Sequence, residues 1–530
     1  MKKIVSAFAI LLLAVTMIFA GGKPQPSVIS LGAPVKIIVE IFDRGTDGGR
    51  SQANNNAWTL WIHDKVLKDL NIEVSFYPVG RWSEDSEIIN LMASGSAPDL
   101  CYTYNTSMIS SFRDQGGIMD LAPYIDRFLP DTRKLLGADP AISGKDFIYR
   151  NIDPSTGRIF SIPSYRVALA QRNIFIRQDW LDKLGLPLPK TTREFHDTLA
   201  AFRDRDPGNV GKNNVIPFGQ DWDARWGMAS LIHPFIDPKL SDRERWINIV
   251  ADVSSRNLTM PGYKEGVRMV NSWYNEGLVF RGFPLMKSTD DFYSIIKSGV
   301  VGSFSGNWDL PYRTDYHILA DLRLNVPGAD LVPVDCIQSS DNINHKDIMD
   351  KAGLQIFVPS FSRQQEAALK YLNWLSIFDN YNFLQVGQEG INHQIVNGVP
   401  QTMARPAGDP WFQNSDKNID YTMPMNGVEL GNQDLNSRVL AFGYGDTPPE
   451  VIVNAYAMAT TNAQSPAVYQ AFTVKDGIYG QTLRDMADAL IAQAVTARTA
   501  DFDKVWDAGI QDWLNSGARE VIEERASIWK

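Results

Sequence analysis

Cysteine is nearly absent from this chain, whose 530 residues include only Cys101 and Cys336. The chain can therefore form one internal disulfide at most, and the sequence does not show that these two residues meet. We expect two free, buried thiols, because an unpaired cysteine behaves as a small apolar side chain.

The chain also lacks the motifs of common catalytic and cofactor sites. It contains no G-x-S-x-G motif, no P-loop and no dinucleotide-binding fingerprint. Carboxylates are abundant, but nothing singles out a pair for glycoside hydrolysis. We therefore predict no catalytic residue and no cofactor. No transition-metal site is predicted either, because no two of the histidines have the spacing of zinc ligands; they are His63, His196, His233, His317, His345 and His393.

Basic residues are in the minority. The chain has 51 Lys and Arg against 61 Asp and Glu, and its formal net charge is −10. It has no long basic run. Nucleic acid is therefore not an expected partner.

Long apolar runs are missing outside the N-terminus. Residues 1–20, "MKKIVSAFAILLLAVTMIFA", join two lysines to an apolar core and end at Ala20, which indicates a signal peptide cleaved near that residue. No other stretch approaches the roughly 18 consecutive apolar residues of a membrane helix. The stretch "IFAGG" resembles a bacterial lipobox, but Gly21 or Gly22 stands where the lipidated cysteine would be. We therefore expect a soluble periplasmic protein without a lipid anchor.

What remains is an ordinary globular composition, 44% hydrophobic and 21% charged. At roughly 150 residues per domain, the length predicts two to four domains or lobes. Alternating strands and helices in the first part of the chain predict a parallel α/β sheet. Residues 21–33 are expected to form a flexible leader. The alternating elements that follow are a strand at 35–42, a helix at 57–70, a strand at 72–79, a helix at 83–95 and a turn with a strand at 97–105.

The same pattern continues along the chain. Amphipathic spacing predicts helices at 191–206, 262–278 and 362–378, and a further strand is expected at 353–360. The tail from 481 to 530 is expected to be helical throughout. There is no internal repeat and no low-complexity tract.

Several aromatic residues stand in polar, turn-rich stretches rather than on apolar faces. A core tryptophan has apolar neighbours at helical or strand spacing, whereas one beside Asp, Asn, Gln and Gly suits an exposed cleft. A sugar ring offers an apolar C–H face for stacking and hydroxyls for polar partners. Any one of these rings could instead cap a loop, but from the set we predict at least one ligand contact. They are Trp82, Trp222, Trp226, Trp308, Tyr312, Trp411 and Phe412.

Several segments resemble one family, the extracellular solute-binding proteins of bacterial ABC importers, in the branch that carries saccharides. The most specific is "IRQDWLDKLGLPLPKTTREFHDTLAAFRDRDP" (176–207), which is similar to "IRxDWLxKLGLxxPxTxxE…AFxxxDP". "ASGSAPDL" (93–100) resembles "SGxxPD", and "GYKEGVRMVNSWYNEGL" (262–278) resembles "xYKEGLxYLNxLYxEGL". "IKSGVVGSFSGNWD" (296–309) and "GQEGIN" (387–392) resemble "GxxGxxxGxW" and "GxEGxH".

In many members of that family, the stretch after "AFxxxDP" resembles a calcium loop. Here "DPGNVGKNNVIPF" (206–218) keeps Asp206, Gly211 and Asn214 but has Gly208, Val210 and Val215 at other positions. One carboxylate and one amide offset the dehydration of calcium poorly. We expect a turn without a tightly held ion, in which Asp206 turns inward to cap backbone N–H groups.

The resemblance implies the two-lobed, type II periplasmic binding protein fold. Each α/β lobe would have a mixed, mainly parallel sheet flanked by helices, with the ligand between the lobes. The first lobe is expected at 34–165 and 350–400, and the second at 166–349 and 401–530.

The implied function is capture of a saccharide, expected to be an oligosaccharide, by closure of the lobes, and its delivery to the membrane subunits of an ABC permease. We expect a monomer. Trp308 matches the family's aromatic position and would stack on the sugar, while Asn307 and Asp309 would bind hydroxyls. Arg177 and Asp179 match the motif, but we expect a structural ion pair near the hinge. Further candidate ligand contacts are Asp43, Arg44, Tyr104, Asn105, Trp222, Asp223, Glu389, Asn392 and Trp411.

Three alternatives stay open at this point. A receptor of the same fold could take a peptide or another polar solute, and a sensory protein could present its ligand to a membrane kinase. A secreted carbohydrate-active enzyme is the third.

Overall fold

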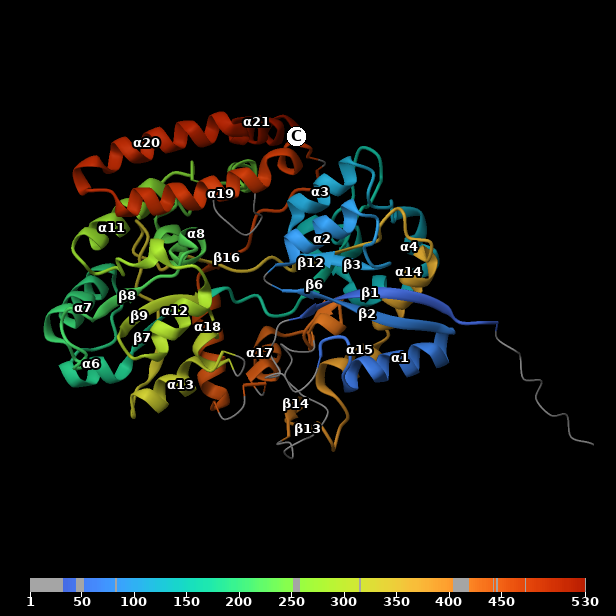
Figure 1. Ribbon diagram of the computed structural model, residues 1–530, viewed down its shortest axis with the longest axis horizontal. Helices are drawn as coiled ribbons and strands as arrows, with labels where there is room; N and C mark the ends of the chain where they lie inside the picture. Colours follow the sequence, from blue (N-terminus) through green and yellow to red (C-terminus); the bar gives the residue numbers. More distant parts are fainter. Residues whose placement is uncertain are drawn as a thin grey trace, which may run out of the picture.

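The computed structural model describes residues 32–43, 52–81, 83–250, 258–313, 316–403, 419–441, 443–444, 447–471 and 473–529. The expected signal peptide and most of the expected leader lie outside these residues. Figure 1 shows two halves side by side, one around strands β1 to β3 and one around β7 to β9. These halves are the two α/β lobes expected from the sequence.

The first lobe is built on a sheet of order β15-β6-β12-β3. The pair β1-β2 continues it, because Val39 of β1 bridges to Leu100 just before β3. Apolar side chains of this sheet, such as Val39 and Ile356, share one core with Trp58, Leu372 and Trp374 of the flanking helices. Its elements are β1 (Val35–Asp43), α1 (Ala57–Leu70), β2 (Ile72–Gly80), α2 (Glu84–Ala93), β3 (Cys101–Thr103), α3 (Thr106–Asp114), α4 (Ile125–Phe128), α5 (Pro130–Leu136), β6 (Ile162–Arg166), β12 (Ala352–Phe357), α14 (Gln365–Leu375), α15 (Phe378–Val386) and β15 (Met425–Asn426).

The second lobe is built on a sheet of order β10-β7-β9-β8 between two helix layers. Strand β7 is buried on both faces: Ile174 and Ile176 pack with helices α7, α11 and α19, and Phe175 packs with α12, α13 and α18. Its elements are β7 (Arg172–Arg177), α6 (Gln178–Leu184), α7 (Thr192–Arg205), β8 (Ile216–Gly219), α8 (Ala224–Gly227), α11 (Tyr263–Asn275), α12 (Thr289–Lys297), β9 (Val301–Asn307), α13 (Ile318–Asn325), β10 (Leu331–Val334), α18 (Pro449–Thr460), α19 (Lys475–Thr496), α20 (Phe502–Trp513) and α21 (Arg519–Ile528).

Local signals account for several of these boundaries. Helix α7 begins where the Thr191 side chain accepts the backbone N–H of Glu194, and it ends at Asp206, whose φ is 47°. Phe195, Leu199 and Phe202 recur at helical spacing and are buried. The tail is helical as expected, in three helices, α19 to α21.

The expectation of mainly parallel sheets needs correction, because strand pairs of both orientations occur. β1-β2, β15-β6 and β8-β9 are parallel, whereas β12-β3, β12-β6, β7-β9 and β10-β7 are antiparallel. The chain passes back and forth between the lobes, so strands enter each sheet from both directions. β1 and β2, which α1 links, keep the parallel arrangement that the N-terminal pattern predicted.

Within the described residues, three segments cross between the lobes: 167–171 between β6 and β7, 335–351 between β10 and β12, and 427–432 after β15. Two of them touch at Gly427, whose φ is 112° and whose Cβ, if it had one, would lie 3.0 Å from the Cβ of Val167. Only glycine adopts this backbone readily, and glycine leaves room for the neighbouring strand.

The stretch before Gly427 packs with the first lobe. Tyr421 and Met423 lie in the core of that lobe, and β15 pairs with β6. We therefore propose that the last segment of the second lobe starts at about residue 427 rather than at 401, because burial in one shared core is what defines a lobe.

The two cysteines lie in different cores. Cys101 is buried in the first lobe and Cys336 in the second, and both thiols are free. The expectation of two free, buried thiols is confirmed.

Candidate functional site

A large cavity lies between the two lobes and has a volume of about 880 Å³. Its walls come from both lobes and from the crossing segments, including Tyr104, Gln171, Trp222, Trp308, Asp350 and Tyr444. Cavities of roughly 300–1,000 Å³ are typical of small-molecule sites. This one is large enough for several sugar rings.

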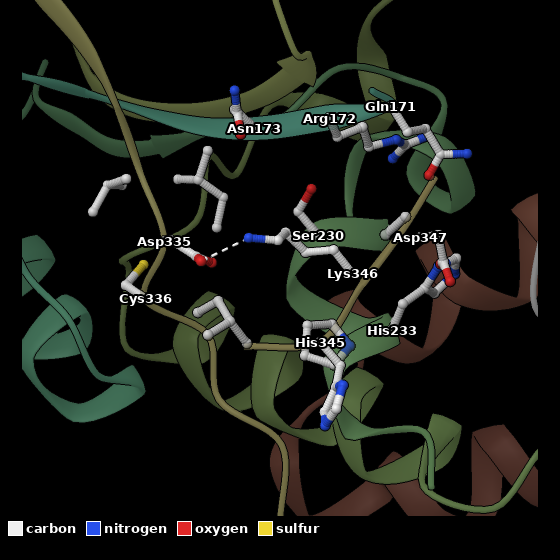
Figure 2. A pocket seen from close by; sticks show the side chains of 15 residues that line it. Gln171, Arg172, Asn173, Ser230, His233, Asp335, Cys336, His345, Lys346 and Asp347 are labelled. Carbon is white, nitrogen blue, oxygen red and sulfur yellow. Dashed lines mark hydrogen bonds and ion pairs between the residues drawn. The ribbon is translucent and has the colours of Figure 1, made fainter. Parts of the chain in front are cut away.

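A second, much smaller cavity lies behind β7 in the second lobe. Its volume is about 40 Å³, and Figure 2 shows its polar lining, in which Nζ of Lys346 lies 2.6 Å from a carboxylate oxygen of Asp335. His233 Nδ1 lies 2.7 Å from Asp347 Oδ2 at its other side. This space suits one or two water molecules and is too small for a sugar.

Strand β9 delivers Asn307, Trp308 and Asp309 to the wall of the large cavity. Trp308 is only 6% exposed, because its indole packs edge-on against Tyr444 and Tyr456, with ring centroids 6.1 and 5.2 Å away. It therefore forms part of the cavity wall and of the second lobe's core at once. Stacking of a sugar on Trp308 stays a prediction.

Asp309 is held by two partners beside Trp308. Its Oδ2 accepts a hydrogen bond from the Tyr444 hydroxyl at 2.6 Å and lies 2.9 Å from Nε of Arg313. The carboxylate is almost fully buried, and its Oδ1 has no hydrogen-bond partner. One oxygen is thus fixed by the protein, and the other is buried in the cavity wall without a partner.

The loop after β8, the parallel neighbour of β9, carries Asp221, Trp222 and Asp223 to the cavity. Trp222 is 50% exposed, so its ring is open to a ligand. Asp223 Oδ1 accepts the backbone N–H of Trp226 at 2.8 Å and fixes the turn into α8. Burial, together with the neighbouring charge of Asp223, raises the pKa of Asp221 to about 7.

The first lobe contributes Tyr104, which follows β3 and lines the cavity. Its ring stacks on Phe42 with centroids 6.1 Å apart, and the guanidinium carbons of Arg81 and Arg166 lie 4.7 and 5.7 Å from its centroid. These contacts hold the ring in a defined orientation.

Four expected contact residues do not line this cavity. Asn105 instead starts α3, where its Oδ1 accepts the backbone N–H of Met108 at 3.2 Å. Asn392 is buried and its Oδ1 accepts the backbone N–H of Gln388 at 2.7 Å. Glu389 is exposed in the same turn, and Asp43 is exposed at the end of β1.

The positions of Asn105 and Asn392 have a common explanation. Asn and Asp side chains fold back on nearby N–H groups, so a polar residue after a strand or in a turn satisfies the backbone as readily as a ligand. Two further candidates, Arg44 and Trp411, lie outside the described residues, as do Trp82 and Phe412. Tyr312 is a core residue whose hydroxyl donates to the carbonyl of Leu331 at 3.1 Å.

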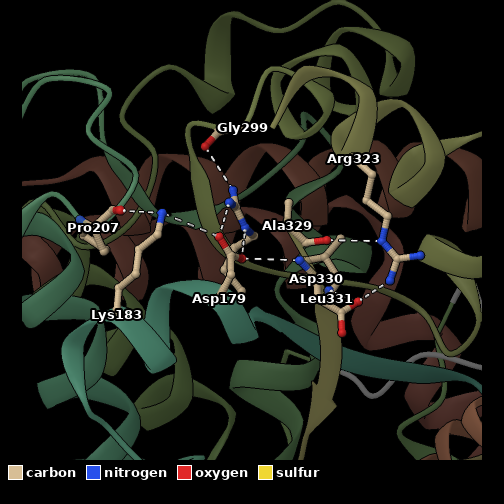
Figure 3. A network of polar contacts seen from close by, with 9 residues as sticks. Asp179, Lys183, Pro207, Gly299, Arg323, Ala329, Asp330 and Leu331 are labelled. Atoms are coloured by element: carbon tan, nitrogen blue, oxygen red, sulfur yellow. Dashed lines mark hydrogen bonds and ion pairs between the residues drawn. The ribbon is translucent and has the colours of Figure 1, made fainter. Parts of the chain in front are cut away.

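Arg177 and Asp179 form the structural ion pair expected from the motif. Nε and Nη2 of Arg177 each lie 2.7 Å from one carboxylate oxygen of Asp179, and Nη1 donates to the carbonyl of Gly299. Figure 3 shows the network around Asp179, which also accepts the backbone N–H of Asp330 at 3.3 Å. Arg177 is fully buried at the end of β7 away from the crossing, so the pair is not near the hinge.

The degenerate calcium-type loop is closed by its own backbone. Asp206 accepts the N–H groups of Val210 and Gly211 at 3.0 and 2.8 Å, the inward cap that the sequence predicted. Asn214 donates to the carbonyl of Val210. The Asp206 carboxylate and the Asn214 amide are thus both engaged within the turn. That no calcium is tightly held in this loop stays a prediction.

Cationic side chains of the cavity were not predicted. Arg81, Arg150, Arg166, Arg172 and Arg313 all line it. Arg166 and Arg172 lie directly before and after the first crossing segment, 167–171. Their nearness to an expected crossing between the lobes is the feature of the sequence that could have indicated them. Periodicity gives no indication of these two, because Arg166 is the last residue of β6 and Arg172 is the first residue of β7.

No protein-family model matches this chain. Lipoprotein LipO of Bacillus subtilis is 22% identical over 484 residues, which cover 87% of this chain and 86% of LipO. The polygalacturonan/rhamnogalacturonan-binding protein YtcQ of the same organism is 20% identical over 484 residues, 88% of each chain. The fructooligosaccharide ABC transporter substrate-binding protein FusA of Streptococcus pneumoniae serotype 4 is 26% identical over 235 residues, 41% of each chain.

Solved structures agree with these relatives in fold. The alginate-binding protein AlgQ2 without calcium ion has a TM-score of 0.67 at 18% identity, covering 95% of this chain and 99% of AlgQ2. FusA in complex with kestose has a TM-score of 0.65 at 14% identity, covering 93% and 98%. The chain is a homologue of ABC-transporter substrate-binding proteins and has their two-lobed fold.

Proposed function

We propose that this protein is the substrate-binding component of an ABC transporter and that it captures an oligosaccharide between its lobes. The observation that carries the proposal is the cavity of about 880 Å³ between the lobes, with the half-exposed ring of Trp222 at its wall. The relatives named above for fructooligosaccharide and for polygalacturonan/rhamnogalacturonan support the choice of a saccharide.

The polar and aromatic lining suits a sugar. Trp222 and Tyr104 offer ring faces from opposite lobes for the C–H face of a pyranose. Asn307 and the free oxygen of Asp309 offer acceptors for hydroxyl groups. A ligand that touches both lobes binds the closed form better than the open form, and this difference drives closure.

The closed protein then docks on the membrane subunits of the transporter and releases its ligand. No covalent bond of the ligand is made or broken during capture, docking and release. The buried carboxylate of Asp309 is engaged with Tyr444 and Arg313, which suits a fixed acceptor better than a proton donor. Incubation with a bound oligosaccharide, followed by mass spectrometry, tests this: recovery of the sugar unchanged is expected, and cleavage products would contradict it.

A thermal-shift screen of saccharides and peptides tests the ligand class. A ligand at about 100 times its Kd adds about 2.7 kcal/mol to the free energy of unfolding and so raises Tm. We expect oligosaccharides to raise Tm and peptides to leave it unchanged. A receptor for peptides would give the reverse result, and mass spectrometry of ligand co-purified with the native protein would then identify the class directly.

We further propose that the chain is exported by its N-terminal signal and acts as a monomer in the periplasm, without a lipid anchor. In the part of the chain that the structure describes, no helix has the length and apolar character that crossing a bilayer requires. Because the relative LipO is named a lipoprotein, metabolic labelling with a lipid precursor is a direct test. Incorporation of label would contradict the proposed absence of an anchor.

A further inference from the structure

The cations that line the cavity differ in whether the protein already neutralises them. Three of them have carboxylate partners: Arg81 lies 2.5 Å from Glu84, Arg150 lies 2.6 Å from Asp350, and Arg313 lies 2.9 Å from Asp309. Arg172 and Arg166 form no ion pair and no side-chain hydrogen bond within the described residues. In a protein of net charge −10, two unpaired arginines in one cavity call for a cause.

Arg172 is the more enclosed of the two. It is 7% exposed, and its Nε and Nη1 are buried without a hydrogen-bond partner. Its guanidinium carbon lies 3.4 Å from the ring centroid of Trp226, which lines the large cavity but not the small one. The stacked guanidinium is therefore held at the wall of the large cavity.

Such an arrangement is costly for the protein in the absence of a ligand. A buried guanidinium that lacks an acceptor loses its hydration without replacement. Burial lowers the pKa of Arg172 to about 9, although Asp223 and Asp221 attract its charge. The group is still cationic at neutral pH, so an anion brought by the ligand would restore the missing interactions.

The shape of the group restricts which anion fits. Trp226 covers part of the guanidinium, and Nε and Nη1 are buried in the cavity wall without an acceptor, so a fitting anion has to reach into that wall and accept from the fork of N–H groups. A carboxylate accepts two parallel N–H bonds from such a fork. Arg166 lies over Tyr104 on the first lobe, and its Nε also lacks a partner, so it offers a second donor set across the cavity.

We propose that the captured oligosaccharide carries carboxylate groups, as a uronate-containing sugar does, and that Arg172 binds one of them while Arg166 assists from the first lobe. This inference rests on the proposed function, because it assigns a charge to the sugar that the cavity takes. Rings stack on Trp222 and Tyr104, and the carboxylate sets the orientation of the chain in the cavity.

The test compares matched sugars on the intact mature protein. Isothermal titration calorimetry is run with tri- and tetrameric galacturonate and mannuronate and with their carboxyl-reduced, neutral counterparts, each at low and at moderate salt. We expect at least one uronate to bind about tenfold or more tightly than its neutral counterpart. That preference is expected to shrink as salt is raised.

Three variants accompany the native protein. Arg172→Gln is expected to weaken uronate binding about 10- to 100-fold with little effect on a neutral counterpart. Arg172→Lys keeps the charge but not the fork, so an intermediate affinity is expected. Arg193→Gln is the control, since the Arg193 side chain is 91% exposed on α7. Melting curves establish that each variant folds.

The outcomes separate the two proposals. If neutral sugars bind as tightly as uronates, or if Arg172→Gln weakens both equally, the inference of an acidic ligand is wrong and the proposed function stands. If no saccharide binds, the proposed function itself is wrong. Should Arg172→Gln not fold, the comparison of matched sugars on the native protein and on Arg166→Gln still decides.

Discussion

Trp222 and Trp308 line the same cavity, but their different burial gives them different tasks. Trp222 is 50% exposed and Trp308 is 6% exposed. An exposed ring adds little to folding, whereas a ring packed against Tyr444 and Tyr456 belongs to the core and stabilises the fold. The two residues thus form a matched pair for mutation.

Trp222→Ala is expected to weaken binding of the cognate oligosaccharide by about tenfold or more, because it removes a stacking surface at the site. Its Tm is expected to stay close to that of the native protein. Trp308→Ala is expected to lower the free energy of unfolding by about 3–5 kcal/mol, because it leaves a cavity in a packed core. Calorimetric titration and denaturant melts measure both. Equal stability losses in the two variants would contradict this division of roles.

Asp221 makes the stability of the ligand-free protein depend on pH. Its pKa is raised from 3.8 to about 7 by burial and by Asp223. Between about pH 4 and 7 the folded protein holds this proton and the unfolded chain releases it, so the free energy of unfolding falls as pH rises through that window.

Asp221→Asn removes this proton equilibrium. We compare the Tm of the variant minus the Tm of the native protein at two pH values. This difference is expected to be several degrees higher at about pH 8 than at about pH 4.5, because only the native protein loses stability as Asp221 ionises. Thermal melts at both pH values measure the difference. A constant difference between the two proteins would show that Asp221 does not titrate in this range.

At the scale of elements, a buried polar network fixes the position of helix α6 relative to strands β7 and β9. Arg177 at the end of β7 is bound to Asp179 in the first turn of α6 and to Gly299 just before β9. The pair therefore ties one helix to two strands of the second sheet (Figure 3). The Arg177–Asp179 pair lies in the segment that resembles the family motif, and a role in holding these elements together explains its burial.

Asp179→Ala is expected to lower the free energy of unfolding by about 3–5 kcal/mol, because the buried guanidinium of Arg177 is left without its counter-charge. Arg498→Ala is the control: the Arg498 side chain is 85% exposed and pairs with Asp501 on the surface. That change is expected to cost about 0–1 kcal/mol. Urea denaturation measures both, and similar losses would contradict a structural role for the buried pair.

The loop that follows α7 shows how a turn persists without its metal ligands. Asp206 caps two backbone N–H groups of the loop, so the carboxylate stabilises the turn directly. We expect about 1 mM calcium to leave the Tm unchanged, with magnesium as the control, because the site has too few oxygen ligands. A rise in Tm specific to calcium would show that the loop still holds the ion. Asp206→Ala is expected to cost about 1 kcal/mol of stability.

At the scale of the whole molecule, the crossings and one helix contact govern relative movement of the lobes. Three short segments join the lobes, and the start of α19 lies against α3 of the first lobe (Figure 1). Arg113 of α3 donates to the carbonyl of Thr473 at 2.6 Å, just before α19. Motion that opens the cavity therefore has to pivot near these contacts.

Saturating oligosaccharide is expected to reduce the radius of gyration measured by small-angle X-ray scattering, because a ligand that contacts both lobes favours the closed form. Trp222→Ala at the same ligand concentration is the control, because it is expected to bind the sugar more weakly. An unchanged radius with a fully bound ligand would mean that the lobes do not close on it.

Local pattern was sufficient for much of the fold. The strands at 35–42 and 72–79 and the helices at 57–70 and 191–206 were expected within one residue or so of β1, β2, α1 and α7. These elements carry their own periodicity, caps and turn residues. Strand orientation was not predictable in the same way, because it depends on how often the chain crosses between lobes.

The sequence by itself determined many of the elements, the net negative charge and the family resemblance, since each follows from neighbouring residues or from composition. Only the tertiary structure decided which polar residues meet. Tyr104, Arg172, Trp222, Trp308 and Tyr444 come together although hundreds of residues separate the first from the last. Candidates such as Asn105 were instead taken up by nearby N–H groups, because a cap needs only local geometry, whereas a shared cavity needs two lobes to face each other.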